Sequence, residues 1–125
     1  MLRQIIGAIG VIFVVVGVLG FFSDQYLLGI FEVNTIHNLV HIASGVVALI
    51  AAASSERVSR IYAQVFGVVY LAVFVLGLVL GGDLLGLFRV NAADNVLHAL
   101  LGVLLVALGF LPVFQTSAVS ARTRP

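Results

Sequence analysis

GIFEVNTIHNLVHIASGVV, residues 29–47, decides the fold of this chain, because GLFRVNAADNVLHALLGVL, residues 86–104, repeats it 57 positions later. The likeness also covers the apolar segment that precedes each copy. Residues 5–53 align with residues 62–110 without a gap, and 16 of the 49 aligned positions are identical. A fixed internal period indicates an architecture made from copies of one structural unit. We therefore predict two tandem repeats, over residues 5–53 and 62–110.

The composition places the chain in a membrane. Of its 125 residues, 62% are hydrophobic and 9% are charged, whereas soluble domains are about 45–50% apolar and about 25% charged. Such a chain cannot cover its surface with polar groups, so we expect the lipid bilayer to surround it. The absence of cysteine excludes disulfides and thiolate metal sites. A net charge of +1 without a basic run predicts no nucleic-acid partner.

Four apolar stretches are long enough to cross a bilayer: residues 5–22, 34–53, 61–80 and 91–113. A spanning helix needs about 20 residues, and helices satisfy every backbone hydrogen bond internally. We predict an all-α fold, a bundle of four transmembrane helices over residues 1–116, with residues 117–125 as a flexible cytoplasmic tail. The first stretch is expected to be a retained helix, since signal-peptide apolar regions are shorter, about 7–15 residues.

The arginines are unevenly distributed between the two sides of the predicted spans. The side of the middle loop and the termini carries five: Arg3, Arg57, Arg60, Arg122 and Arg124. The other side carries Arg89 alone, beside three acidic residues, Asp24, Glu32 and Asp83. Positive charge accumulates on the cytoplasmic side of membrane proteins. We therefore predict that both termini are cytoplasmic.

A polar stripe runs along the second and the fourth predicted helix. The spacing i, i+4, i+7, i+11 is shared by Asn34, Asn38, His41 and Gly45 and by Asn91, Asn95, His98 and Gly102. Residues at this spacing lie on one helix face. Lipid penalises exposed asparagine and histidine, so we expect both stripes to point into the bundle and toward each other.

The asparagines and one aspartate have structural interpretations. Asn34 and Asn91 stand where helices are expected to begin, and asparagine is among the best N-caps. Asp94, three residues after Asn91, fits a capping box. Asn38 and Asn95 lie one turn deeper, where we expect an interior polar cluster that hydrogen-bonds across a helix interface.

The histidines leave three alternatives open. Without a cofactor, the imidazoles of His41 and His98 satisfy neighbouring polar groups. Alternatively, His41 and His98 on diagonal helices are the axial ligands of a haem b. In the third alternative His37, His41, His98 and Asp94 bind a divalent transition metal, for which three imidazoles and a carboxylate suit Zn²⁺, Cu²⁺ or Ni²⁺.

Glu32 and Arg89 occupy the same repeat position on the two outer loops, with opposite charges. We predict an ion pair between them across the repeat axis. An exposed pair contributes under about 1 kcal/mol, so it would set the pairing of the repeats more than their stability.

Three motifs carry a family resemblance: LLGIFEVNTIHNLVH at residues 27–41, GLFRVNAADNVLH at residues 86–98 and AQVFGVVY at residues 63–70. At these residues the chain resembles a prokaryotic family of small four-span membrane proteins that is classed as a domain of unknown function. The likeness covers most of residues 1–112. It implies the four-span fold and a multi-pass place in the prokaryotic cytoplasmic (inner) membrane, and it implies no particular activity.

No motif for catalysis is present in the sequence: there is no nucleophile with its base, no phosphate-binding loop and no paired carboxylates. We predict a non-enzymatic membrane protein that serves as a structural or accessory subunit. It is expected to pack with itself as a homo-oligomer or within a larger membrane complex. The alternative is a haem- or metal-binding membrane protein that uses His41 and His98, with His37 and Asp94.

Overall fold

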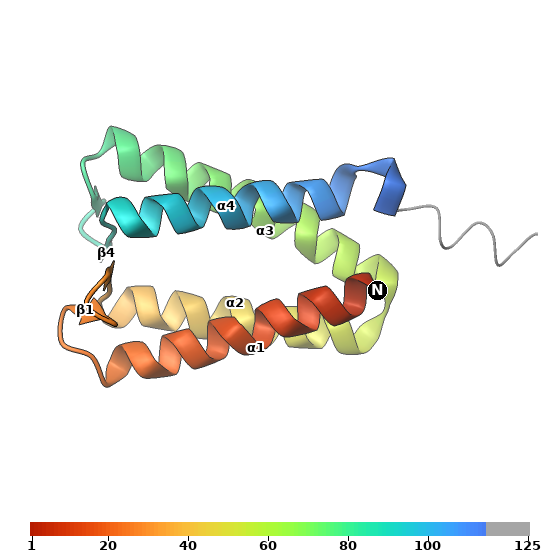
Figure 1. Cartoon of the computed structure of the whole chain (residues 1–125), viewed down its shortest axis with the longest axis horizontal. Coiled ribbons are helices and arrows are strands. Elements are labelled where there is room, and N and C mark those ends of the chain that lie inside the picture. Colours follow the sequence, from red (N-terminus) through yellow and green to blue (C-terminus); the bar gives the residue numbers. More distant parts are fainter. Residues whose placement is uncertain (115–125) are drawn as a thin grey trace, which may run out of the picture.

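The computed structural model describes residues 1–114, which form four long helices and two small β-hairpins (Figure 1). Each of these helices is long and apolar enough to cross a membrane, which confirms the predicted all-α membrane fold. The elements in chain order are α1 (Leu2–Phe21), β1 (Tyr26–Leu27), β2 (Phe31–Glu32), α2 (Thr35–Ser54), α3 (Glu56–Val79), β3 (Asp83–Leu84), β4 (Phe88–Arg89), α4 (Ala92–Phe110) and a 3-10 turn (Pro112–Phe114). The predicted tail, residues 117–125, lies outside the described residues.

The connection between α2 and α3 is much shorter than the sequence suggested. We expected a loop over residues 54–60, but α3 begins at Glu56. Ser55 separates the two helices, and its side-chain oxygen accepts a hydrogen bond from Val58 N at 3.1 Å. This N-cap lets the charged segment that follows join the helix.

Both connections at the opposite end are β-hairpins, which the sequence analysis treated only as loops. β1 pairs with β2 and β3 with β4, both antiparallel. Leu28 and Gly29 have φ angles of 55° and 70°, and Leu85 and Gly86, 57 positions later, have 58° and 71°. Successive positive φ angles turn the chain tightly. We call this end of the molecule the hairpin end, and the end with Met1 and Ser55 the terminal end.

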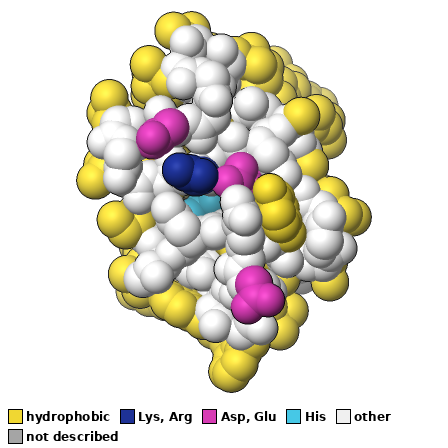
Figure 2. Space-filling view, turned by 90° about the vertical axis from the view of Figure 1, so that its left-hand side faces the viewer, with side chains coloured by type: hydrophobic (Ala, Val, Ile, Leu, Met, Phe, Trp, Pro, Cys, Tyr) yellow, Lys and Arg dark blue, Asp and Glu magenta, His cyan; other side chains and the backbone are white. Residues whose placement is uncertain are grey.

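Seen from the hairpin end, apolar side chains form the rim, and charged side chains lie nearer the middle (Figure 2). The tips of the hairpins are apolar as well, since Leu28 and Leu85 are each 77% exposed. The rim continues the apolar faces of the helices, which lipid would surround in a membrane.

The helices associate as two pairs, α1 with α2 and α3 with α4, and α3 also contacts α1 and α2 (Figure 1). Glycines allow the close approach within each pair. A Cβ atom on Gly10 would lie 2.9 Å from the carbonyl oxygen of Gly45, and one on Gly67 would lie 2.8 Å from the backbone nitrogen of Val106. Small residues at such contacts are characteristic of helix packing in lipid.

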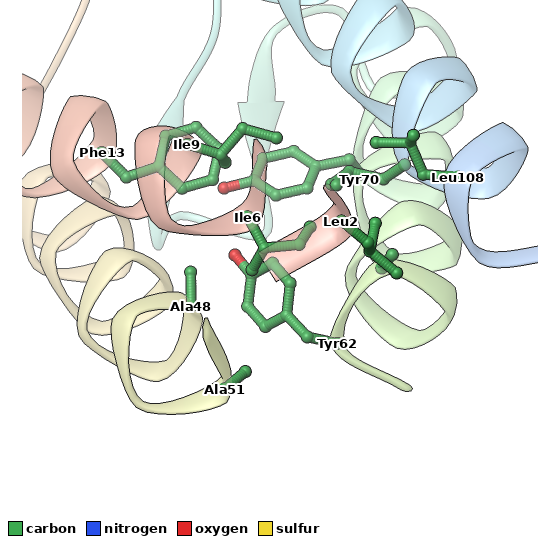
Figure 3. Close-up of a cluster of buried hydrophobic side chains, with 11 residues drawn as sticks. Leu2, Ile6, Ile9, Phe13, Ala48, Ala51, Tyr62, Tyr70 and Leu108 are labelled. Atoms are coloured by element: carbon green, nitrogen blue, oxygen red, sulfur yellow. The ribbon is translucent and has the colours of Figure 1, made fainter. Parts of the chain in front are cut away.

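The apolar core fills the terminal half of the space between the pairs (Figure 3). Its side chains come from all four helices, and Ile6, Ala48, Ala63 and Leu105 are completely buried. The other core members are Leu2, Ile9, Phe13, Ala51, Tyr62, Tyr70 and Leu108. The half nearer the hairpins contains the polar stripes, together with the buried side chains of Leu27, Val33, Leu84 and Val90.

Candidate metal centre

Three histidines meet between the helix pairs, near the hairpin end. His37 and His41 are one turn apart on α2, and His98 lies on α4. One ring nitrogen from each lies within 4.8 Å of the other two. The ring centroid of His37 is 4.6 Å from that of His41 and 5.9 Å from that of His98. All three side chains are buried. The two copies of the repeat therefore bring their histidines together at one interior site.

Aromatic rings enclose this cluster from three sides. Phe13 of α1 stacks on His41, with ring centroids 5.9 Å apart and an interplanar angle of 10°. Phe88 of β4 lies against His37 at 5.6 Å, and Tyr70 of α3 against His98 at 5.6 Å. The three histidines, Phe88 and Tyr70 line a cavity of about 40 Å³, together with Val40, Ser44, Val69 and Val73. A cavity of this size has room for one ion or one water molecule.

Several ring nitrogens of the histidine cluster lack hydrogen-bond partners. Both nitrogens of His37 and the Nδ1 atoms of His41 and His98 are buried without a hydrogen bond of standard geometry within the described chain. The backbone of Glu32 and of Arg89 lies close to the His37 ring. An unsatisfied buried polar group costs about 1–3 kcal/mol, so such groups normally have a partner. Neutral imidazole nitrogen is a good metal ligand. Four such nitrogens in one cluster are donors that a bound ion would satisfy.

A single metal ion fits this set of donors. Three imidazoles with an open fourth position are a known zinc ligand set, and Zn–N bonds of about 2.0–2.1 Å place the nitrogens of a tetrahedral site about 3.3 Å apart. The separations here reach at most 4.8 Å. Small rotations of the rings would close this difference. Imidazole also suits Cu²⁺ and Ni²⁺.

A haem does not fit between His41 and His98. We expected the helices with His41 and His98 to be diagonal in the bundle, with a gap between them wide enough for a macrocycle. In the structure His37 lies beside both rings, and Phe13, Phe88 and Tyr70 occupy the surrounding space. The remaining cavity of about 40 Å³ holds far less than a porphyrin. Of the two cofactor alternatives, the geometry favours the metal ion.

Asp94 does not belong to the metal centre, contrary to one of our expectations. Its Oδ2 atom accepts hydrogen bonds from Asn91 N at 2.9 Å and from Glu32 N at 3.1 Å. Its backbone nitrogen donates to Asn91 Oδ1 at 2.9 Å. The two bonds with Asn91 form the capping box of α4, and the carboxylate is directed at backbone nitrogens and not at the histidines. The bond to β2 was not predicted, and it ties α4 to the hairpin of the first repeat.

Asn34 and Asn91 are the N-caps of α2 and α4, and each also contacts the other repeat. Asn34 Nδ2 donates to the carbonyl oxygen of Leu87 at 3.4 Å, and Asn91 Nδ2 donates to that of Ile30 at 2.7 Å. The two bonds are equivalent by repeat position. Each bond connects the N-cap of a helix that carries histidine to the hairpin turn of the other repeat, and so helps to position α2 and α4 relative to each other.

Asn38 and Asn95 do not form the interhelical hydrogen bonds that we predicted. Their Oδ1 atoms are buried without a partner among the described residues. Each amide instead packs against a glycine of the neighbouring helix in its own pair, Gly20 for Asn38 and Gly77 for Asn95. The amides therefore point away from the histidines.

The predicted ion pair between Glu32 and Arg89 is also not formed. Within residues 1–114 the ion pair lies at the other end, between the Met1 amine and Glu56 at 3.3 Å. Glu32 Oε1 instead accepts a hydrogen bond from Gln25 Nε2 at 3.4 Å. Glu32 and Arg89 do line one polar cavity of about 410 Å³ at the hairpin end, where water can solvate each charge separately.

Comparison with known proteins adds one finding. The sequence profile of the family described as "Domain of unknown function (DUF4383)" matches residues 3–111, and this confirms the family resemblance. No curated protein and no solved structure matches the chain.

Proposed function

The chain belongs to this family of unknown function, and we propose that it is a small integral membrane protein that binds one divalent transition-metal ion through His37, His41 and His98. The observation that carries the proposal is the convergence of three buried imidazoles, each with a nitrogen within 4.8 Å of the others, and four of their nitrogens lack a hydrogen bond of standard geometry. The same residues line a cavity of about 40 Å³. A buried histidine with a purely structural role normally has hydrogen-bond partners for its ring nitrogens.

A direct test is titration of the detergent-solubilised protein with Zn²⁺, Cu²⁺ and Ni²⁺, followed by calorimetry and elemental analysis. We expect one ion per chain. His37→Ala, His41→Ala and His98→Ala should each weaken binding by more than about 10–100-fold, the loss typical of removing even an outer-shell partner. A protein that takes up no ion, or that binds equally well without these imidazoles, would contradict the proposal and leave water as the guest.

The chain offers a control that separates folding from metal binding. His37 occupies the repeat position of Asp94, three residues after the N-cap Asn34. The substitution His37→Asp would give α2 the capping box that α4 already has, and the cap would occupy the new carboxylate. We expect this variant to fold normally, as seen by circular dichroism, and to lose the metal ion.

The proposed role is binding and not catalysis. Asp94 is the buried carboxylate among the described residues, and its Oδ2 atom binds two backbone nitrogens at the start of α4 and in β2. The bases of the centre are the three imidazoles, and as metal ligands they would not be free to move a proton to a substrate. An accessory role, within a homo-oligomer or a larger membrane complex, is compatible with this function and stays a prediction.

A further inference from the structure

The candidate metal centre lies much closer to one end of the bundle than to the other. His41 is the seventh residue of α2, and His98 is the seventh of α4. At about 1.5 Å per residue, both lie roughly 10 Å from the hairpin end. A further 13 residues of α2 separate His41 from the terminal end, a distance of about 20 Å.

The terminal side of the centre is closed by the apolar core. Ile6, Ala48 and Leu105 are 0% exposed there, and the rings of Tyr62 and Tyr70 lie across the space between the helix pairs (Figure 3). The hydroxyl of Tyr62 donates to the carbonyl oxygen of Ser44 at 3.1 Å and joins α3 to α2. Because an unpaired ion in an apolar medium is extremely unfavourable, this core is a barrier to a metal ion.

On the hairpin side of the centre, the surface of the protein is polar and hollowed. The cavity of about 410 Å³ there is lined by Asp24, Glu32 and Arg89, with amide groups from Asn34 and Asn38. In the view onto this end, a basic side chain lies between acidic ones, and a histidine is visible beneath it (Figure 2). His37, the histidine in contact with β4, is only 1% exposed. His37 is therefore covered at this end, and side chains above it would have to move before an ion could reach it.

We infer that the metal ion enters and leaves only at the hairpin end, and that the Arg89 side chain covers the entrance while Glu32 attracts the ion. This inference rests on the proposed metal centre. The centre is then closed toward the terminal end, and it exchanges its ion with one side of the membrane only. Such a site suits capture or sensing of a cation, and it does not suit passage of the ion through the protein.

The role of Arg89 can be tested by the kinetics of metal binding. The chain has three tyrosines and no tryptophan, and Tyr70 touches His98, so quenching of tyrosine fluorescence by Cu²⁺ reports binding. We expect Arg89→Ala to raise the association rate about tenfold or more, because a positive charge leaves the entrance. Glu32→Gln should lower it. The matched control is Arg57→Ala, which removes an exposed arginine at the terminal end. Equal rates for the two arginine variants would overturn the assignment of Arg89.

The one-sided access can be tested in proteoliposomes loaded with Cu²⁺. The chain has no native cysteine, so a membrane-impermeant maleimide on Leu85→Cys measures the share of molecules whose hairpin end faces outward. An impermeant chelator added outside should then remove the ion from that share alone. Removal from all molecules, or only from those facing inward, would overturn the inference. If the protein binds no Cu²⁺ in detergent, the metal centre itself fails, so the two failures are distinguishable.

Discussion

Asn34 and Asn91 each use one amide group for two contacts. The carbonyl oxygen of the amide caps the residue's own helix, and the amide nitrogen binds a carbonyl of the opposite hairpin. These bonds hold α4, which carries His98, against the hairpin of the first repeat. They likewise hold α2, which carries His37, against the hairpin of the second repeat. The proposed metal centre depends on this local arrangement, because His37 and His98 come from different pairs of helices.

The two asparagines should differ in their contribution to stability. We expect Asn91→Ala to lower the free energy of unfolding by about 1–2 kcal/mol, the upper part of the range for an N-cap. Asn34→Ala should lower it less, since its bond to Leu87 is 3.4 Å long, whereas the bond from Asn91 to Ile30 is 2.7 Å. Unfolding in mixed detergent and dodecyl sulfate, followed by circular dichroism, measures both values.

Aspartate at the same positions isolates the contact between the repeats. Its carboxylate caps a helix as well as an amide does, but it cannot donate a hydrogen bond. Asn91→Asp should therefore keep the cap of α4 and lose the bond to Ile30. If Asn91→Asp and Asn91→Ala are both neutral, the cross-repeat bond does not stabilise the fold.

At the scale of elements, the backbones of α1 and α2 touch at Gly10 and Gly45. A Cβ on Gly10 would lie 2.9 Å from the Gly45 carbonyl oxygen and 3.1 Å from the Cβ of Ala48. Backbone atoms cannot move aside as the end of a side chain can. The two helices would have to separate, and this separation would disturb the packing of Phe13 on His41 further along the same interface.

We predict that Gly10→Ala destabilises the protein by about 1–3 kcal/mol, the usual effect of overpacking. Gly7→Ala is the matched control in the same helix, because its Cβ would lie 3.5 Å from that of Ala52, an ordinary contact. It should change stability by less than about 1 kcal/mol, in the direction favoured by the higher helix propensity of alanine. The same unfolding measurement applies, and equal losses for the two variants would contradict the close contact.

The helices could be predicted because each is a long apolar segment, a signal that depends only on local sequence. The hairpins could not, because strands of two residues show no periodicity, and Leu28 adopts a positive φ that leucine rarely takes. The start of α3 was misplaced for a similar reason. Its first turn is charged, and the cap provided by Ser55 outweighs that polarity.

The candidate site was predictable only in part. The spacing along each helix placed His41 and His98 on inward faces, and the cap positions followed from the same pattern. The relative depth and distance of α2 and α4 depend on contacts between the repeats, which no local pattern contains. For this reason the sequence could not decide between a haem and a metal ion, and it grouped Asp94 with the histidines although its carboxylate binds backbone nitrogens.

At the scale of the whole molecule, the two ends differ in charge. Arg3 lies at the terminal end, where it donates to the carbonyl oxygens of Ala52 and Ala53 at the end of α2, and Arg57 lies in the first turn of α3. Arg89 stands at the hairpin end beside Asp24 and Glu32. The positive-inside rule then predicts that the terminal end lies in the cytoplasm, and that the entrance of the proposed metal centre lies on the opposite side of the membrane.

This orientation predicts which positions a membrane-impermeant maleimide reaches in intact prokaryotic cells. Leu85→Cys, at an exposed hairpin tip, should be labelled in intact cells, and Ser54→Cys, at the terminal end of α2, only after lysis. The background is clean because the chain has no cysteine. Reversing the charges with Arg57→Glu and Arg60→Glu should weaken the difference, since the arginine bias sets the orientation. The opposite labelling pattern would place the entrance to the histidines in the cytoplasm, and the ion bound there would come from the cytoplasmic pool.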